Sequence, residues 1–221
     1  MNNELFTRVD EYISNLLGIE DEALKATEKS IGEAGIPQIS VSPVQGKFLE
    51  ILARLCKATK ILELGTLAGY STICLARALP NNGRLITLEV DPKHAAVAQN
   101  NINRAQLQDL VEIRIGKALD LLLQLEQEGM APFDMIFIDA DKPPYAEYFQ
   151  WALRLSRPGT LIIADNVIRE GKVLDENSED EMVRGVQRFN KMLSETTSVT
   201  STIIQMIGTK EHDGMAIAIV N

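Results

Sequence analysis

The sequence predicts an α/β fold, a doubly wound and mostly parallel seven-stranded sheet with helices on both faces. Short apolar runs alternate with helical patterns from residue 60 onward, which is typical of parallel strands joined by helices. The last two runs, 200–207 and 215–220, are separated only by a polar turn, so we expect an antiparallel hairpin at or near a sheet edge. Residues 1–59 show helical spacing alone. We interpret them as an N-terminal helical cap within a single domain of residues 1–221.

The remaining elements follow in a regular order along the chain. We expect strands at 60–64, 84–89, 111–115, 133–138 and 160–164. We expect helices between and after them at 71–79, 92–105, 118–128, 145–155 and 180–194. The second of these helices has Asp91 as its cap and Pro92 at its first position, where the missing N–H of proline costs nothing.

Composition excludes several classes of protein. The chain has 221 residues, of which 45% are apolar and 24% charged, as in ordinary globular domains rather than disordered or fibrous proteins. Its net charge of −9 should repel phosphate backbones and anionic membranes. We therefore expect a small-molecule partner and no nucleic-acid or membrane partner.

Three further features predict a cytoplasmic protein. No apolar run approaches the roughly 20 residues that span a bilayer, and Met1–Leu5 lacks the basic start of a signal peptide. Cys56 and Cys74 cannot form a disulfide framework, so we expect buried, reduced thiols. His94 and His212 have no second His or Cys at metal-ligand spacing, and we expect both at the surface.

The loop after the first strand has the composition of a cofactor-binding turn. Ligands of open α/β sheets bind beyond the carboxyl ends of the strands, where residues 63–71 lie. Gly65 and Gly69 have Gly-x-x-x-Gly spacing, unlike the Gly-x-Gly-x-x-Gly of pyrophosphate binders. Glu63 would repel a pyrophosphate but attract the ammonium of an amino-acid tail. Ser71 can offer its hydroxyl and nearby N–H groups to the carboxylate of that tail.

The ends of the next two strands supply further candidates. Glu89 ends the second strand and can accept both hydroxyls of a ribose, although a solvated strand-end charge is the alternative. Asp91 is the competing acid, but its position before a proline suits a helix cap better. Ala118 follows Gly116 after the third strand and leaves room for a flat ring such as adenine; the alternative for this glycine is an ordinary turn.

Oxygen-bearing side chains end the fourth and fifth strands. Asp139 follows the fourth strand, and Asp165 and Asn166 follow the fifth, so a parallel sheet brings them to the same edge. Three oxygen ligands suit a hard divalent cation such as Mg²⁺, whereas single strand-end acids more often cap helices. Lys142 should point into the same cleft, where it can act as a general base toward a hydroxyl; its alternative is a surface lysine.

With these residues the sequence resembles the cation-dependent class I O-methyltransferases, which include the caffeoyl-CoA and catechol O-methyltransferase groups and their bacterial relatives. The resemblance extends from about Ile39 to the C-terminus. The shared features are Glu63-Leu64-Gly65, Gly69-Tyr70-Ser71, Glu89, Asp139-Ala140-Asp141-Lys142 with Tyr145, Pro158-Gly159 and Asp165-Asn166.

The resemblance implies a Rossmann-like fold that binds S-adenosylmethionine and commonly forms a dimer. It implies that a divalent cation, Mg²⁺ before Mn²⁺ or Ca²⁺, is held by Asp139, Asp165 and Asn166, and that Lys142 is the base. It places a larger set of residues along the cofactor, namely Val41, Glu63, Gly65, Thr66, Ser71, Glu89, Ala118 and Asp139.

The predicted activity is methylation of one of two vicinal hydroxyls on a catechol-type phenol. A nicotinamide-dependent oxidoreductase is the first alternative, opposed by the glycine spacing and by Glu63. A non-catalytic module that binds the cofactor and regulates a partner is the second, opposed by the cation ligands and by Lys142. The polar loop at 168–178 matches no single acceptor, and the acidic chain disfavours a coenzyme A ester.

Overall fold

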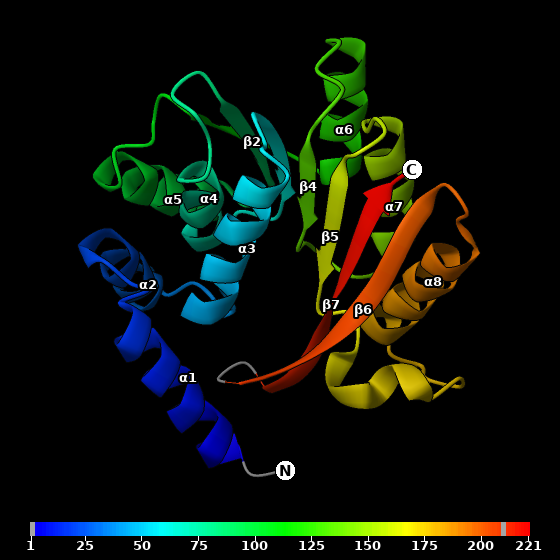
Figure 1. Cartoon of the computed structure of the whole chain (residues 1–221), viewed down its shortest axis with the longest axis horizontal. Coiled ribbons are helices and arrows are strands. Elements are labelled where there is room, and N and C mark those ends of the chain that lie inside the picture. Colours follow the sequence, from blue (N-terminus) through cyan, green and yellow to red (C-terminus); the bar gives the residue numbers. More distant parts are fainter. Residues whose placement is uncertain (1–2, 209–210) are drawn as a thin grey trace.

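A computed structural model describes residues 3–208 and 211–221 and confirms the predicted fold class (Figure 1). One seven-stranded sheet has the order β3-β2-β1-β4-β5-β7-β6. Its strands are β1 (Lys60–Leu64), β2 (Arg84–Glu89), β3 (Val111–Ile115), β4 (Met135–Ile138), β5 (Leu161–Asp165), β6 (Val199–Gly208) and β7 (Glu211–Val220). The first five strands pair in parallel, and β7 pairs antiparallel with both β5 and β6. The C-terminal hairpin thus forms the edge that the sequence predicts.

Helices cover both faces of this sheet. The N-terminal helices are α1 (Asn3–Leu17), α2 (Glu22–Ala34) and α3 (Pro43–Leu55). The others are α4 (Tyr70–Ala76), α5 (Pro92–Arg104), α6 (Ala118–Gln127), α7 (Tyr145–Arg154), a kinked 3₁₀ segment η1 (Arg169–Leu174) and α8 (Glu181–Glu195). Figure 1 shows α3, α4 and α5 on one side of the sheet and α6, α7 and α8 on the other. None of the helices among the described residues is long and apolar enough to cross a membrane.

Side chains that alternate between the two faces of the sheet form one hydrophobic core on each face. On β4, Ile136 and Ile138 belong to the cluster that packs against α6, α7 and α8, whereas Met135 and Phe137 belong to the cluster on the α3–α5 side. All four side chains are completely buried. Successive strand residues point to opposite faces, so a central strand covered on both sides must be apolar throughout.

The largest differences from the predicted boundaries are at the end of α4 and the start of β7. Helix α4 ends at Ala76 instead of residue 79, because the N–H groups of Ala78 and Leu79 bond to carbonyls only three residues back, which tightens the chain out of the α-helix. Strand β7 begins at Glu211 rather than 215, because backbone pairing with β6 continues past the apolar side chains. The remaining part of the predicted turn, residues 209–210, lies outside the described residues.

The strand order reverses between β1 and β4, and this reversal positions the functional site. Chain connections leave the two strands in opposite directions across the sheet, which opens a crevice beyond their carboxyl ends. Helix α3 closes one side of that crevice. It begins at a capping box in which the Gln45 N–H donates to the Ser42 hydroxyl (3.2 Å) and the Ser42 N–H donates to Gln45 Oε1 (2.9 Å).

Candidate active site

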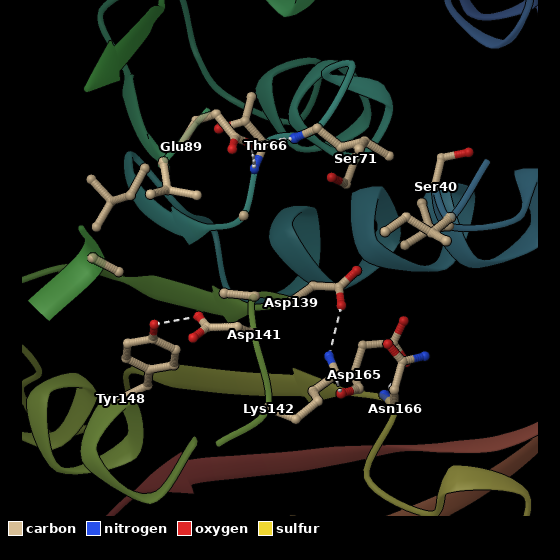
Figure 2. A pocket seen from close by; sticks show the side chains of 18 of the residues that line it. Ser40, Thr66, Ser71, Glu89, Asp139, Asp141, Lys142, Tyr148, Asp165 and Asn166 are labelled. Carbon is tan, nitrogen blue, oxygen red and sulfur yellow. Dashed lines mark hydrogen bonds and ion pairs between the residues drawn. The ribbon is translucent and has the colours of Figure 1, made fainter. Parts of the chain in front are cut away.

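A cavity of ≈1190 Å³ opens at the carboxyl ends of the parallel strands. The structure brings most of the predicted site residues to its wall, from six different parts of the chain. Those that line it are Val41, Gly65, Thr66, Ser71, Glu89, Ala118, Asp139, Lys142, Asp165 and Asn166. Figure 2 shows Glu89, Thr66 and Ser71 on one side of the site and Asp139, Lys142, Asp165 and Asn166 on the other. The cavity is large enough for a cofactor and a small acceptor together.

Glu63 is the one predicted site residue that does not line the cavity. Its side chain is completely buried on β1, where it accepts hydrogen bonds from the hydroxyls of Ser71 (2.6 Å) and Thr72 (2.5 Å). Burial raises the pKa of the Glu63 carboxyl to about 7 despite these two donors. Glu63 therefore lies behind Ser71 and orients its hydroxyl, and the expectation that it faces the cofactor is not met by its position.

Gly65 brings the first loop close to the end of β4. Its φ of +95° is unfavourable for any residue with a Cβ, and a Cβ built there would lie 2.1 Å from the carbonyl oxygen of Asp139. Only glycine permits this approach. The close contact places the cofactor loop and Asp139 side by side on the cavity wall.

Glu89 fixes the conformation of the same loop from the end of β2. Its Oε2 accepts the N–H groups of Thr66 (3.2 Å) and Leu67 (2.8 Å), and its Oε1 accepts the N–H of Asp91 (2.9 Å). These bonds keep the carboxylate on the wall of the cavity and leave it further lone pairs. Glu89 is only 7% exposed, so it is not the solvated strand-end charge of the alternative interpretation.

Lys142 lies among oxygen atoms at the other end of the cavity. Its Nζ donates to Asp139 Oδ1 (3.1 Å), to the Tyr145 hydroxyl (2.5 Å) and to the carbonyl oxygen of Asp165 (3.4 Å). The Tyr145 hydroxyl in turn contacts the same Asp165 carbonyl at 2.9 Å. Lys142 is only 4% exposed. The alternative interpretation of Lys142 as a surface lysine is therefore wrong.

Two carboxylates and an amide oxygen gather beside Lys142. Asp139 and Asp165 line the same wall, and burial together with the Asp139 charge raises the pKa of the Asp165 carboxyl to about 7. Asn166 follows with a left-handed φ of 57°, a conformation that asparagine tolerates better than most residues. Within residues 3–208 and 211–221, no three His, Cys, Asp or Glu side chains form a candidate metal cluster. The predicted ligand set has only two such residues, and Asn166 is its third member.

Comparison with known proteins now assigns the family. A family model described as O-methyltransferase matches residues 14–219. A catechol O-methyltransferase of Niastella koreensis is 71% identical over 220 residues, covering 100% of both chains. A catechol O-methyltransferase of Mycobacterium tuberculosis is 45% identical over 96% of this chain and 94% of its own. The chain belongs to the O-methyltransferase family.

Solved structures agree with this assignment. The O-methyltransferase from Bacillus cereus in complex with SAH has a TM-score of 0.97 and 50% identity, covering 99% of each chain. TomG from Streptomyces achromogenes in complex with SAM has a TM-score of 0.97 and 48% identity, covering 100% of this chain and 99% of its own. This O-methyltransferase is therefore an enzyme of the methyltransferase class.

Sequence reasoning missed several residues at the site of this O-methyltransferase. His94 and His212 were expected at the surface, yet both are partly buried and line the cavity, with His94 Nδ1 3.7 Å from Glu89 Oε1. The sequence marked Tyr145 only as part of a motif. In the structure its hydroxyl accepts a hydrogen bond from Lys142 Nζ and positions that nitrogen. No sequence pattern marked the two histidines, because the fold alone brings them to the crevice.

Gly185 is a further missed residue, in the middle of α8. A Cβ built there would lie 2.2 Å from the carbonyl oxygen of Lys142, so the glycine lets α8 pack against the backbone at Lys142 and Pro143. A glycine inside a helical pattern costs about 1 kcal/mol relative to alanine. A glycine in the middle of a helical pattern was therefore the one signal in the sequence that this position serves close packing.

Proposed function

We propose that this O-methyltransferase transfers a methyl group from S-adenosylmethionine to one of two vicinal hydroxyls of a catechol-type phenol, with the help of a divalent cation. The observation that carries the proposal is the placement of two carboxylates, one amide oxygen and a buried lysine at one end of a cavity whose other end has the cofactor loop. Relatives named catechol O-methyltransferase support the choice of acceptor.

The cofactor end has the groups that S-adenosylmethionine requires. Gly65 lets the loop pack against the end of β4, since a Cβ there would lie 2.1 Å from the Asp139 carbonyl oxygen. Ser71 lines the cavity and donates its hydroxyl proton to Glu63 (2.6 Å), which leaves the oxygen lone pairs to accept from the ammonium of an amino-acid tail. Glu89 can accept hydroxyls of a ribose, and Ala118 leaves space for a flat base.

The donor set at the other end fits a hard cation. Asp139, Asp165 and Asn166 would hold it through oxygen atoms only, which favours Mg²⁺ or Mn²⁺ over Zn²⁺. When bound, the cation supplies positive charge that stabilises the deprotonated acceptor hydroxyl.

Residues of the chain carry out the proton transfer and position the reacting groups. Lys142 Nζ takes the proton of the acceptor hydroxyl as the general base, and its contact with the Tyr145 hydroxyl holds that nitrogen in place. The hydroxyl oxygen then bonds to the methyl carbon as the bond from carbon to the sulfonium sulfur breaks, which releases S-adenosylhomocysteine. Holding oxygen and methyl in contact can supply roughly 7–11 kcal/mol of the rate enhancement.

A methyl-transfer assay with mass-spectrometric detection tests this function. We expect mono-methylated catechol with S-adenosylmethionine and Mg²⁺, and no product with EDTA. Asp139→Ala should lose cation binding and activity together, whereas Asp109→Ala, which removes an exposed carboxylate, should retain both. Methylation by Asp139→Ala in the presence of EDTA would contradict the cation role. Binding of NADH instead of S-adenosylmethionine would favour the oxidoreductase alternative.

We also propose that the protein is a homodimer. Helix α1 presents exposed apolar side chains, with Val9, Tyr12, Leu16 and Leu17 each at least 45% exposed. An apolar surface of this kind favours association with a second copy. Light scattering coupled to gel filtration should give twice the 24.5 kDa chain mass, and Tyr12→Glu with Leu16→Glu should give the monomer.

A further inference from the structure

Arg169 is a cation on the cavity wall, and no ion pair joins it to an acid within the described residues. It is the first residue of η1 and lies three residues after Asn166. Its Nε is buried and has no hydrogen-bond partner, and no carboxylate of the described part of the chain lies within 4 Å of its guanidinium. A buried donor without a partner costs about 1–3 kcal/mol, and no hydrogen bond from Nε ties the Arg169 side chain to the protein.

Two acidic side chains of the neighbouring segments, Asp213 and Glu170, bond to groups other than the Arg169 guanidinium. Asp213 on β7 lines the same cavity, but its Oδ1 accepts the backbone N–H groups of Ile168 (2.9 Å), Arg169 (2.9 Å) and Gly214 (2.8 Å). Glu170 forms an ion pair with Lys172 at 3.0 Å. Asp213 thus fixes the backbone of Arg169 and leaves the side-chain Nε without a partner.

The backbone at this point is held in an unfavourable conformation. Arg169 and Glu170 have left-handed φ values of 54° and 59°, although neither is glycine or asparagine. Each such residue costs of order 1–2 kcal/mol, and clusters of them are typical of ligand sites. The two bonds from Asp213 to the N–H groups of Ile168 and Arg169 stabilise this conformation, which places Arg169 on the cavity wall.

Its position puts Arg169 at the acceptor end rather than the cofactor end. It follows Asn166 by three positions, a span of at most about 11 Å between Cα atoms. The proposed ribose and base contacts, Glu89 and Ala118, belong instead to the ends of β2 and β3, on the other side of the strand reversal. An acceptor that reaches Asp139 and Asn166 through its hydroxyls would therefore have its ring substituent near Arg169.

We propose that Arg169 binds a carboxylate on the acceptor, so that the preferred substrates are catechols with an acidic ring substituent. This inference rests on the proposed function and names the acceptor class of the same site. A planar guanidinium matches a carboxylate with two parallel hydrogen bonds, which a lysine cannot provide. Arg169 lies in a cavity that also contains Asp141, Glu170 and Asp213, and this acidic surrounding suits one carboxylate better than the several phosphates of a coenzyme A ester.

Paired substrates test this proposal. The kcat/KM for 3,4-dihydroxybenzoate is compared with that for its primary amide, which has nearly the same shape and no charge. We expect the natural enzyme to prefer the acid by at least about 10-fold. Arg169→Gln should lower the ratio of acid to amide by about 10- to 100-fold, mainly through KM of the acid, as expected for loss of hydrogen bonds to a charged group. Arg169→Lys, which retains the charge, should keep part of the preference.

Lys172→Gln is the matched control, because it removes an exposed cation of the same segment that is already paired with Glu170. It should leave the ratio unchanged. Equal kcat/KM for acid and amide in the natural enzyme, or an equal fall of the ratio in Lys172→Gln, would overturn the proposal while leaving catechol methylation intact. No transfer to either substrate would overturn the proposed function as well.

Two further outcomes separate other partners for the guanidinium. Affinity for S-adenosylmethionine, measured by calorimetry, should change less than threefold in Arg169→Gln; a larger loss would assign the guanidinium to the cofactor. A catechol-bearing coenzyme A thioester that outcompetes the free acid, with a preference that requires Arg169, would assign it to phosphate. Either result would overturn the carboxylate proposal.

Discussion

Replacing Glu63 by glutamine should remove a large part of the pH dependence of stability. The Glu63 carboxyl is completely buried, and its pKa is raised from 4.5 to about 7 chiefly by burial. Below pH 4.5 it is protonated in both the folded and the unfolded chain. Between pH 4.5 and 7 only the unfolded chain releases its proton, so this group makes the folded state less stable as pH rises. The full loss above pH 7 is about 3 kcal/mol.

Glutamine keeps the shape of the side chain and can satisfy both neighbours. One hydroxyl, that of Ser71 or Thr72, would donate to Oε1, and the other would turn to accept from Nε2. We therefore expect Glu63→Gln to gain between about 2 and 3 kcal/mol over the natural protein on going from pH 5 to pH 8.

Urea unfolding of both proteins at a series of pH values measures this difference. The expected gain corresponds to a relative shift of the urea midpoint of about 1 M. Glu176→Gln, which removes an exposed carboxyl, controls for the change in net charge. Parallel curves for Glu63→Gln and the natural protein between pH 5 and 8 would refute the reasoning, because they would mean that the buried carboxyl ionises as it does in water.

Three further substitutions have defined outcomes. Gly65→Ala should lower the free energy of unfolding by about 2 kcal/mol or more, because the new Cβ meets the Asp139 carbonyl, and it should weaken S-adenosylmethionine binding in calorimetry. The control Gly129→Ala has a similar φ of +67° but open space around it, and it should lower the free energy of unfolding by only about 1 kcal/mol. Tyr145→Phe leaves a bond to Lys142 unmade and should reduce kcat at least 10-fold with little change in cofactor affinity; an unchanged kcat would remove its positioning role. Glu89→Gln should weaken cofactor binding about 10-fold by calorimetry, and an unchanged Kd would contradict the ribose contact.

The sequence predicted the fold class and most of the cavity wall for a physical reason. Buried parallel strands leave apolar runs of four to six residues, and the polar residues that follow them must lie at the carboxyl edge. Asp139, Asp165 and Asn166 were therefore placed on one edge by topology alone. The resemblance to O-methyltransferases indicates the same three residues as ligands of a divalent cation, and this ligand role stays a proposal.

The residues that the sequence misplaced or did not single out depend on three-dimensional contacts. Glu63 ends up behind the cavity because Ser71 and Thr72 of the following helix turn back onto it. His94 reaches the cavity wall because α5 begins beside Glu89. Arg169 lies in a polar loop whose conformation depends on Asp213, 44 residues away. None of these contacts leaves a periodic pattern in the sequence.

The central claim is that Asp139, Asp165 and Asn166 bind one divalent cation together. A crystal of the protein with Mn²⁺ and S-adenosylhomocysteine, measured at the manganese absorption edge, tests it most directly. The account predicts one anomalous peak per chain, with a side-chain oxygen of each of the three residues about 2.0–2.4 Å away. A peak bound elsewhere, or none at this site at millimolar Mn²⁺, would contradict it.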